Sequence, residues 1–135
     1  MTEYENPKIF SDLLIFFKKC YSVHQGLPKL FRIAVSEKLL NEITEGMKLV
    51  ALANFKKNNQ IELLSGADDL KELRGRIEVI KAYCLVAWEM EYYSHAFFAD
   101  VNSRIEEISK QAAKWEIWMR LQAQKRSQFF SKNLP

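Results

Sequence analysis

Apolar residues recur at helical spacing along most of this chain, and the pattern is clearest toward its C-terminus. From residue 98 to residue 119 the apolar positions follow one another in steps of three and four, which places them along one stripe of an α-helix. This stripe consists of Phe98, Val101, Ile105, Ile108, Ala112, Trp115 and Met119. Because a stripe of this kind needs apolar surface to cover it, the pattern predicts a helix that packs against other helices.

Three earlier segments carry stripes of the same kind. The predicted helices span about residues 7–25, 28–57, 60–90 and 95–128. Since only a few residues connect each helix to the next, consecutive helices are expected to run antiparallel. The sequence therefore predicts a single all-α domain over residues 1–135, an antiparallel up-down-up-down four-helix bundle.

Each of these three helices is expected to turn one set of side chains inward. In the first, the set is Phe10, Leu13, Leu14, Phe17 and Tyr21. In the second, it is Phe31, Val35, Leu39, Ile43, Met47 and Val50. In the third, it is Leu63, Ala67, Leu70, Leu73, Ile77, Ile80, Cys84 and either Ala87 or Trp88.

Residues with special backbone preferences mark the expected helix ends. Asn6 is a suitable N-cap, with Pro7 at the first helical position, where a missing N–H costs nothing. Gly26 is expected to close the first helix in the left-handed conformation. Pro28 suits the first turn of the second helix, and Ser94 suits the N-cap of the fourth.

Two glycines fall inside predicted helices, where glycine is unfavourable. Gly46 costs about 1 kcal/mol relative to alanine, so either a close helix contact requires it or the fold simply tolerates it. Gly66 follows Ser65 near the start of the third helix, and the pair is a candidate for a kink.

The composition excludes several classes of protein. Hydrophobic residues make up 48% of the 135 residues, and the chain holds only four glycines and three prolines. These values argue against disorder and against a β-sandwich, which needs frequent turns. Cys20 and Cys84 lie far apart on helical stripes, which favours reduced core thiols. With no secretion signal or membrane-length apolar run, the sequence predicts a cytoplasmic protein.

The sequence offers no constellation of catalytic residues. A di-metal site in a helical bundle needs Glu-x-x-His, yet Tyr21 and Tyr92 stand three residues before His24 and His95. His24, near a helix C-terminus, suits a capping role, and His95 is expected to be exposed or to make a minor contact. No phosphate-binding glycine loop is present. The expectation is therefore a protein without enzymatic activity, metal or cofactor.

Positive charge is concentrated in the fourth predicted helix. Residues 109–135 hold six basic residues and one acid, while the whole chain carries a net charge of only +3. On a helical wheel Lys110 points away from the apolar stripe, and Lys114 and Lys125 lie on one flank with Trp118. Arg126 adds to this basic surface, which is either an ordinary solvated face or a surface that binds phosphate groups. Trp118 either packs within the protomer, contacts another subunit or stacks on a base, and a subunit contact is preferred.

Three stretches resemble one family of four-helix bundles. Residues 27–39, which begin Leu27-Pro28-Lys29, resemble the family's Leu-Pro-Lys-x-x-Arg opening motif, with Arg32 at its arginine. Residues 107–115 resemble its closing Glu-Ile-Gly motif, which ends at Trp115, and Leu70-x-x-Leu73-Arg74 matches a central motif. The family includes proteins encoded by intervening sequences of bacterial 23S rRNA genes and Avd, the accessory variability determinant of diversity-generating retroelements. In this chain Ile33 replaces the family's phenylalanine, and Ser36 and Ser109 replace glycines.

The resemblance implies a function without catalysis. Avd forms a barrel-shaped homopentamer with a basic surface and associates with a reverse transcriptase and its template RNA. Carried over residue by residue, the resemblance places Lys29, Arg32, Arg74 and Lys110 at basic positions of the motifs, where each arginine could instead pair with a neighbouring acid. These motif positions and the basic face of the fourth predicted helix together give the residues expected to bind RNA or DNA: Lys29, Arg32, Arg74, Lys110, Lys114, Lys125 and Arg126. The alternative is an oligomeric protein-interaction scaffold, of the kind encoded by rRNA intervening sequences, that binds no nucleic acid.

Overall fold

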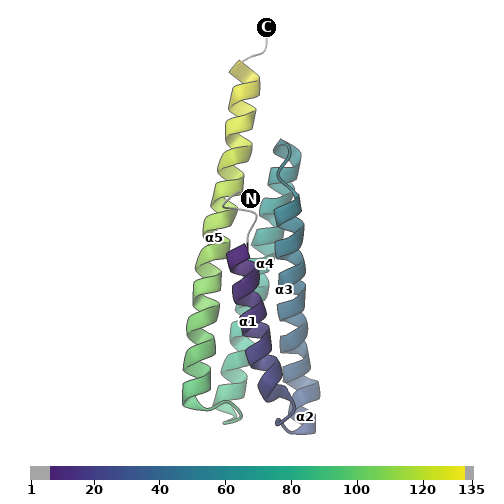
Figure 1. Cartoon of the computed structure of the whole chain (residues 1–135), viewed down its shortest axis with the longest axis vertical. Coiled ribbons are helices and arrows are strands. Elements are labelled where there is room, and N and C mark those ends of the chain that lie inside the picture. The colour runs from purple at the N-terminus through teal and green to yellow at the C-terminus, as the bar shows by residue number, and fades with distance from the viewer. Residues whose placement is uncertain (1–6, 133–135) are drawn as a thin grey trace.

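The computed structural model describes the backbone of residues 7–132 and the side chains of residues 8–128, and within this range the chain forms helices and no strands. Helix α1 spans Pro7–His24, α4 spans Gln60–Glu89 and α5 spans His95–Lys132. Between α1 and α4, three continuous pieces make one long rod: α2 (Lys29–Phe31), the π-helix η1 (Arg32–Ser36) and α3 (Glu37–Phe55). Figure 1 shows that consecutive rods run antiparallel, which confirms the predicted four-helix bundle.

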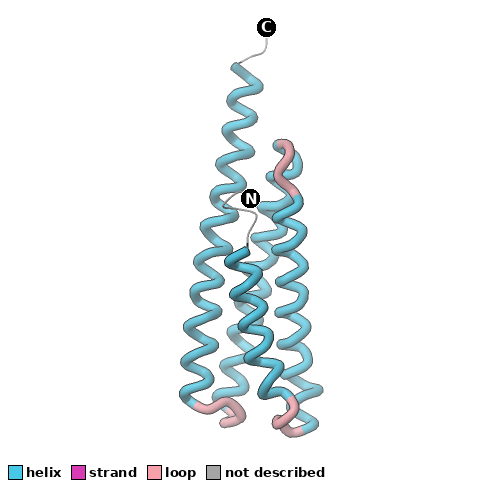
Figure 2. The backbone as a smooth tube through the Cα atoms, in the orientation of Figure 1, coloured by secondary structure: helices cyan, strands magenta, loops and turns pink. Residues whose placement is uncertain are grey.

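Short loops connect the four rods, and their positions agree with the sequence (Figure 2). The second rod ends at Phe55, two residues earlier than predicted, whereas α5 continues to Lys132, beyond the predicted residue 128. As a result, the C-terminal turns of α5 extend past the α3–α4 loop (Figure 1). Pro7 begins α1 as predicted, and the proposed N-cap Asn6 lies outside the described residues.

The prediction for Gly26 was wrong. No glycine in the described part of the chain has a positive φ. The N–H of Gly26 instead donates to the Val23 carbonyl at 3.2 Å, and the N–H of Leu27 donates to the His24 carbonyl at 3.1 Å. These bonds tighten the end of α1 without a positive φ at Gly26. Pro28, with ψ 146°, then turns the chain into α2.

The left-handed residue is instead Glu91, in the connection between α4 and α5, whose φ is 64°. The N–H of Tyr92 donates to the Ala87 carbonyl and that of Glu91 donates to the Trp88 carbonyl, each at 2.9 Å. This pair of bonds is the Schellman arrangement that closes many helices. Ser94 then accepts a hydrogen bond from the N–H of Phe97 at 3.1 Å, which confirms it as the N-cap of α5.

The predicted stripes of α4 and α5 are almost entirely confirmed. All of the α4 positions are buried, with Ala87 rather than Trp88 at the last position, and on α5 only Phe98 is half-buried. Gly46 and Gly66 lie where helices approach closely: an added Cβ would lie 3.1 Å from Leu73 Cδ1 and 2.6 Å from Met119 Cε, respectively. A close contact therefore explains Gly46. Helix α4 runs on through Gly66 as one element.

The stripe predicted for α1 was wrong in register. The buried side chains are Ile9, Leu13, Phe16 and Cys20. Of the predicted positions, only Leu13 is fully buried, while Leu14 and Phe17 are half-buried and Phe10 and Tyr21 are exposed. Residues 13–17 are all apolar, so two registers fit the sequence equally well. Packing against α3 and α5 selects the one that buries Phe16.

A similar shift occurs in the second rod. Phe31, Leu39, Ile43 and Val50 are buried as predicted, but Val35 and Met47 are only half-buried. The buried position after Phe31 is Ser36, because the π-helical turn of η1 contains an extra residue. The Ser36 hydroxyl lies 2.7 Å from Nδ1 of His24, so His24 satisfies a buried polar group rather than only capping α1.

The two cysteines also lie in the core. Cys20 and Cys84 are free and buried, in agreement with the prediction of core thiols. A hydrogen bond with Cys20, together with burial, raises the pKa of the Cys84 thiol. His95 is exposed, as predicted, and accepts a hydrogen bond from Nε1 of Trp88 at 2.9 Å.

Candidate nucleic-acid interface

Three of the seven predicted binding residues lie exposed on the outer face of α5. These are Lys110, Lys114 and Lys125. None of them forms a salt bridge with another residue that the structure describes. Lys110 and Lys114 are one turn apart, and Lys125 follows three turns later on the same side, about 16 Å along the axis. The lysines therefore form a single row of cations with their charges unneutralised.

Arg74 takes part in an ion-pair cluster. Its Nη1 lies 2.8 Å from Oε1 of Glu116, and Arg120 lies 2.9 Å from the other oxygen of the same carboxylate. Arg120 also reaches Asp68 at 3.3 Å. Burial opposes ionisation of Glu116, but the hydrogen bonds from Arg74 and Arg120 outweigh it and lower the pKa of this carboxyl. The single acid in the basic region thus holds two arginines in place between α4 and α5.

The two other predicted arginines bind neutral oxygens of the protein. Arg32 donates to the backbone and side-chain oxygens of Gln25 at 3.5 and 3.4 Å. Arg126 donates to the carbonyl of Asn58 and, at 3.4 Å, to that of Lys57, so it fastens α5 to the α3–α4 loop. These bonds occupy part of each guanidinium and leave its charge unneutralised.

The seven predicted residues do not form one continuous site. Lys29 is exposed on α2, at the end of the bundle opposite the α3–α4 loop that Arg126 contacts (Figure 1). Arg32 lies beside it on η1, whereas Lys110, Lys114 and Lys125 follow α5. The structure therefore separates the basic positions of the opening motif from those of the C-terminal helix.

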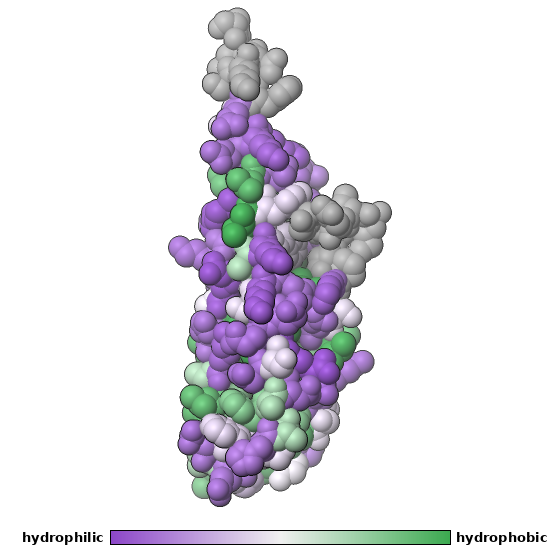
Figure 3. Space-filling view, turned by 90° about the vertical axis from the view of Figure 1, so that its left-hand side faces the viewer, coloured by the Kyte–Doolittle hydropathy of each residue, from purple (hydrophilic) through white to green (hydrophobic). Residues whose placement is uncertain are grey.

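Trp118, the predicted subunit contact, is half-buried and packs against the core of its own protomer. Among the side chains of α5 that the structure describes, the large hydrophobic ones that are exposed are Ile117 and Leu121, at 60% and 48%. Figure 3 looks onto the α5 side of the bundle and shows a narrow hydrophobic strip among hydrophilic residues in its upper half. A helical wheel would have found Ile117, because it lies two turns after Lys110 on the same face.

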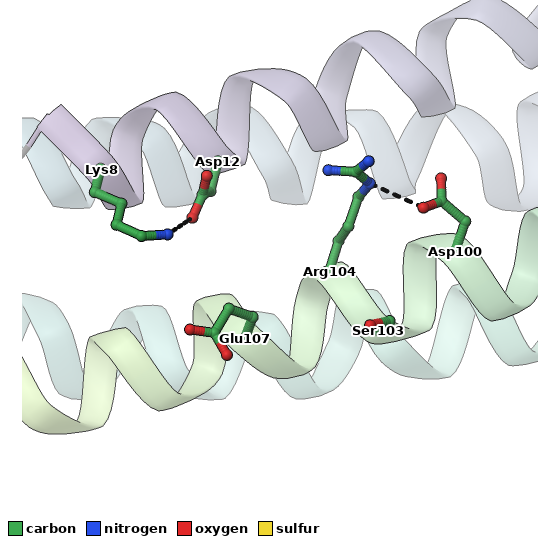
Figure 4. A pocket seen from close by; sticks show the side chains of 6 residues that line it. All are labelled: Lys8, Asp12, Asp100, Ser103, Arg104 and Glu107. Atoms are coloured by element: carbon green, nitrogen blue, oxygen red, sulfur yellow. Dashed lines mark hydrogen bonds and ion pairs between the residues drawn. The ribbon is translucent and has the colours of Figure 1, made fainter.

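A charged groove between α1 and α5 was not predicted from the sequence. It has a volume of about 360 Å³ and is lined by Lys8, Asp12, Asp100, Ser103, Arg104 and Glu107 (Figure 4). These side chains are largely paired with one another: Lys8 lies 3.0 Å from Asp12, and Arg104 lies 3.1 Å from Asp100. Each of these pairs joins residues of one helix. The contacts that connect α1 to α5 are Lys19 with Asp100 at 2.9 Å and the hydrogen bond from Gln111 to Asp12 at 2.7 Å.

Pairing also affects the carboxyl groups of the groove. Burial opposes the ionisation of Asp12, but hydrogen bonds from Gln111 and Lys8 lower its pKa. A hydrogen bond from Lys19 lowers the pKa of Asp100. Both groups are therefore held as carboxylates, which suits them to fixing α1 on α5 rather than to transferring protons.

The side chains that the structure describes contain no cluster of His, Cys, Asp or Glu able to hold a metal ion. None of the described helices has both the length and the apolar composition required to cross a bilayer. Comparisons of this chain with protein-family models, with curated proteins and with solved structures found no match.

Proposed function

We propose that this protein is a non-enzymatic, homo-oligomeric accessory protein that binds RNA or DNA through the outer face of α5. The observation that carries the proposal is the row of Lys110, Lys114 and Lys125, which are exposed and have no carboxylate partner in the described structure. A row of this kind suits the regular negative charge of a nucleic-acid backbone. In a homo-oligomer the row is repeated, which strengthens its attraction for a polyanion.

The resemblance of residues 27–39 and 107–115 to the Avd family extends the proposal to a biological role. On this basis the protein works with a reverse transcriptase in a diversity-generating retroelement, as a ring of five copies. Arg74 supports the fold in this role through its ion pair with Glu116. Lys29 and Arg32 form a second, separate basic patch at the α2 end.

The proposal is tested by reversing the charges of the lysine row. The variant combines Lys110→Glu, Lys114→Glu and Lys125→Glu, and the control combines Lys18→Glu, Lys38→Glu and Lys48→Glu, which change exposed lysines of α1 and α3 by the same total charge. Binding to a structured RNA and to single-stranded DNA is measured by fluorescence anisotropy at several salt concentrations. The first variant should bind at least about tenfold more weakly, and its salt dependence should fall by about one phosphate contact per lysine.

Equal losses in the variant and in the control would mean that only net charge matters, and would refute this site. Circular dichroism of each variant confirms that the helices are retained. Co-purification with the reverse transcriptase of the same genetic element tests the biological role separately.

A protein-interaction scaffold is the second candidate, and it is favoured by the apolar strip of Ile117 and Leu121 beside the lysines. Exposed apolar residues on an otherwise polar face are typical of protein contacts. This candidate predicts wild-type RNA binding that is negligible at every salt concentration, together with loss of a protein partner in an Ile117→Glu variant.

A further inference from the structure

Helix α4 carries apolar residues on two opposite faces. One face forms the core, while the other presents Val79 and Val86, which are 39% and 38% exposed. Gly75 and Ala82 are exposed on the same outer stripe, because spacings of four, three and four residues bring these positions to one side of a helix. Helices that are apolar on both sides are normally covered on both sides. No other element that the structure describes fully covers this second face of α4.

Gly75 is a separate indication that something approaches α4 closely. Gly46 and Gly66 are explained by neighbouring helices inside the protomer, but an added Cβ at Gly75 would have no neighbour within 4 Å. Its φ is not positive, so the backbone does not require glycine either. A glycine in the middle of a helix costs about 1 kcal/mol relative to alanine. No contact within the described part of the protomer uses the missing side chain, so the room at Gly75 is open to a contact from outside.

We propose that two copies of this chain pair antiparallel through the outer face of α4. The stripe Gly75, Val79, Ala82 and Val86 has the same spacing when read in either direction. With a two-fold axis midway between Val79 and Ala82, Gly75 faces Val86 of the second copy and Val79 faces its Ala82. Each small residue of one copy thus lies opposite a larger residue of the other, so the stripe is complementary to itself.

The charges beside the stripe fit the same arrangement. Lys71 and Glu89 are both exposed and form no salt bridge with any residue in the described range. Because they are eighteen residues, or five turns, apart, they lie on the same edge of α4. They are also almost equally far from the two-fold axis. Lys71 of each copy therefore meets Glu89 of the other, and symmetry forms this ion pair twice.

This complementarity identifies a second copy as the occupant rather than an unrelated helix. A foreign partner would require neither the symmetric spacing of the small residues nor charges of opposite sign at matching distances. The pairing is independent of the lysine row on α5. If five copies form a ring, the α4 contact joins two rings into ten copies.

The experiment is a charge exchange, followed by light scattering after size exclusion. The experiment compares four proteins: the wild type, Lys71→Glu, Glu89→Lys and the double variant. Lys38→Glu on α3 is the matched single-charge control. Each single reversal places like charges opposite each other and should reduce the particle mass by half. The double variant should restore the wild-type mass, because it recreates both ion pairs with their signs exchanged.

A second variant tests the close approach without weakening the helix. Gly75→Gln introduces a good helix former at an exposed position, so the protomer should fold at least as well, but its side chain would hold the two α4 helices apart. The particle mass should again be halved, whereas Ile15→Gln, at a residue of α1 that is 39% exposed, should leave it unchanged. A wild-type particle with an odd number of copies, single reversals that keep the wild-type mass, or a double variant that does not recover it would overturn the pairing. A particle of five copies would do so while leaving the proposed function intact.

Discussion

At the scale of single residues, Glu116 changes the meaning of the charge pattern. In the sequence it is one acid among six bases of residues 109–135. In the structure the Glu116 carboxylate forms ion pairs with Arg74 of α4 and with Arg120 of α5. The positive charge left for a ligand on α5 therefore comes mainly from lysines, which is why the proposed contact is with phosphate groups rather than with base edges.

Glu116→Gln is expected to destabilise the protein by about 2 kcal/mol at neutral pH, because it weakens two hydrogen bonds to charged groups. Since folding lowers the pKa of Glu116 below its usual value of 4.5, the ionised carboxylate stabilises the fold above that pH. This contribution is lost as the pH falls through the lowered pKa. Urea denaturation at pH 7 and at pH 3 should therefore show a difference between variant and wild type that shrinks in acid. A difference of equal size at both pH values would contradict the ion-pair role.

The helical glycines allow a second prediction at this scale. In a Lys71→Glu background, where the proposed pairing is absent, Gly75→Ala should stabilise the protomer by about 1 kcal/mol, because the new methyl group meets nothing within 4 Å. Gly66→Ala should fail to stabilise it, because its methyl group would meet Met119 and the Lys56 carbonyl, the latter at 3.3 Å. Denaturant midpoints report both changes. A destabilising Gly75→Ala would reveal a contact inside the protomer.

At the scale of elements, helix ends and local helix type decide which side chains are buried. The π-helical turn of η1 moves the buried position from Val35 to Ser36, after which Leu39, Ile43 and Val50 of α3 are buried as predicted. The buried hydroxyl is acceptable because His24, at the end of α1, is within hydrogen-bond distance. The extra residue and its polar partner therefore act together to join α1 to the second rod.

The end of α4 offers the clearest test of an element boundary. Glu91 adopts a left-handed conformation, which costs an L-residue about 1 kcal/mol or more. Glu91→Gly should therefore stabilise the protein by about 0.5–1 kcal/mol in thermal or urea unfolding. Met90→Gly is the control: because Met90 has a φ of −85°, glycine gains nothing there and should reduce stability. Equal effects at the two positions would contradict the assignment of this helix end.

At the scale of the whole molecule, α5 and α4 present two different kinds of surface. Its outer face carries the lysine row, while α4 presents the apolar stripe proposed to pair with a second copy. Since the two surfaces use different residues, their variants give separate results: reversal of the α5 lysines changes nucleic-acid affinity, and exchange of Lys71 with Glu89 changes particle mass. Loss of one property with retention of the other identifies which proposal has failed.

The amino-acid sequence by itself determined the number, order and direction of the helices and the buried stripes of α4 and α5. In α5 polar residues separate most of the apolar ones, and in α4 the buried stripe is the one that continues along the helix from Leu63 to Ala87. The sequence also located the exposed lysines, since a helical wheel places Lys110 opposite the core. Tertiary structure alone decided the register of α1, where a continuous apolar run fits two stripes, and the shift at η1, where no residue pattern marks the π-turn. It also decided that Arg74 faces Glu116 and that Gly75 has no neighbour, because such contacts depend on which residues of distant helices become adjacent in space.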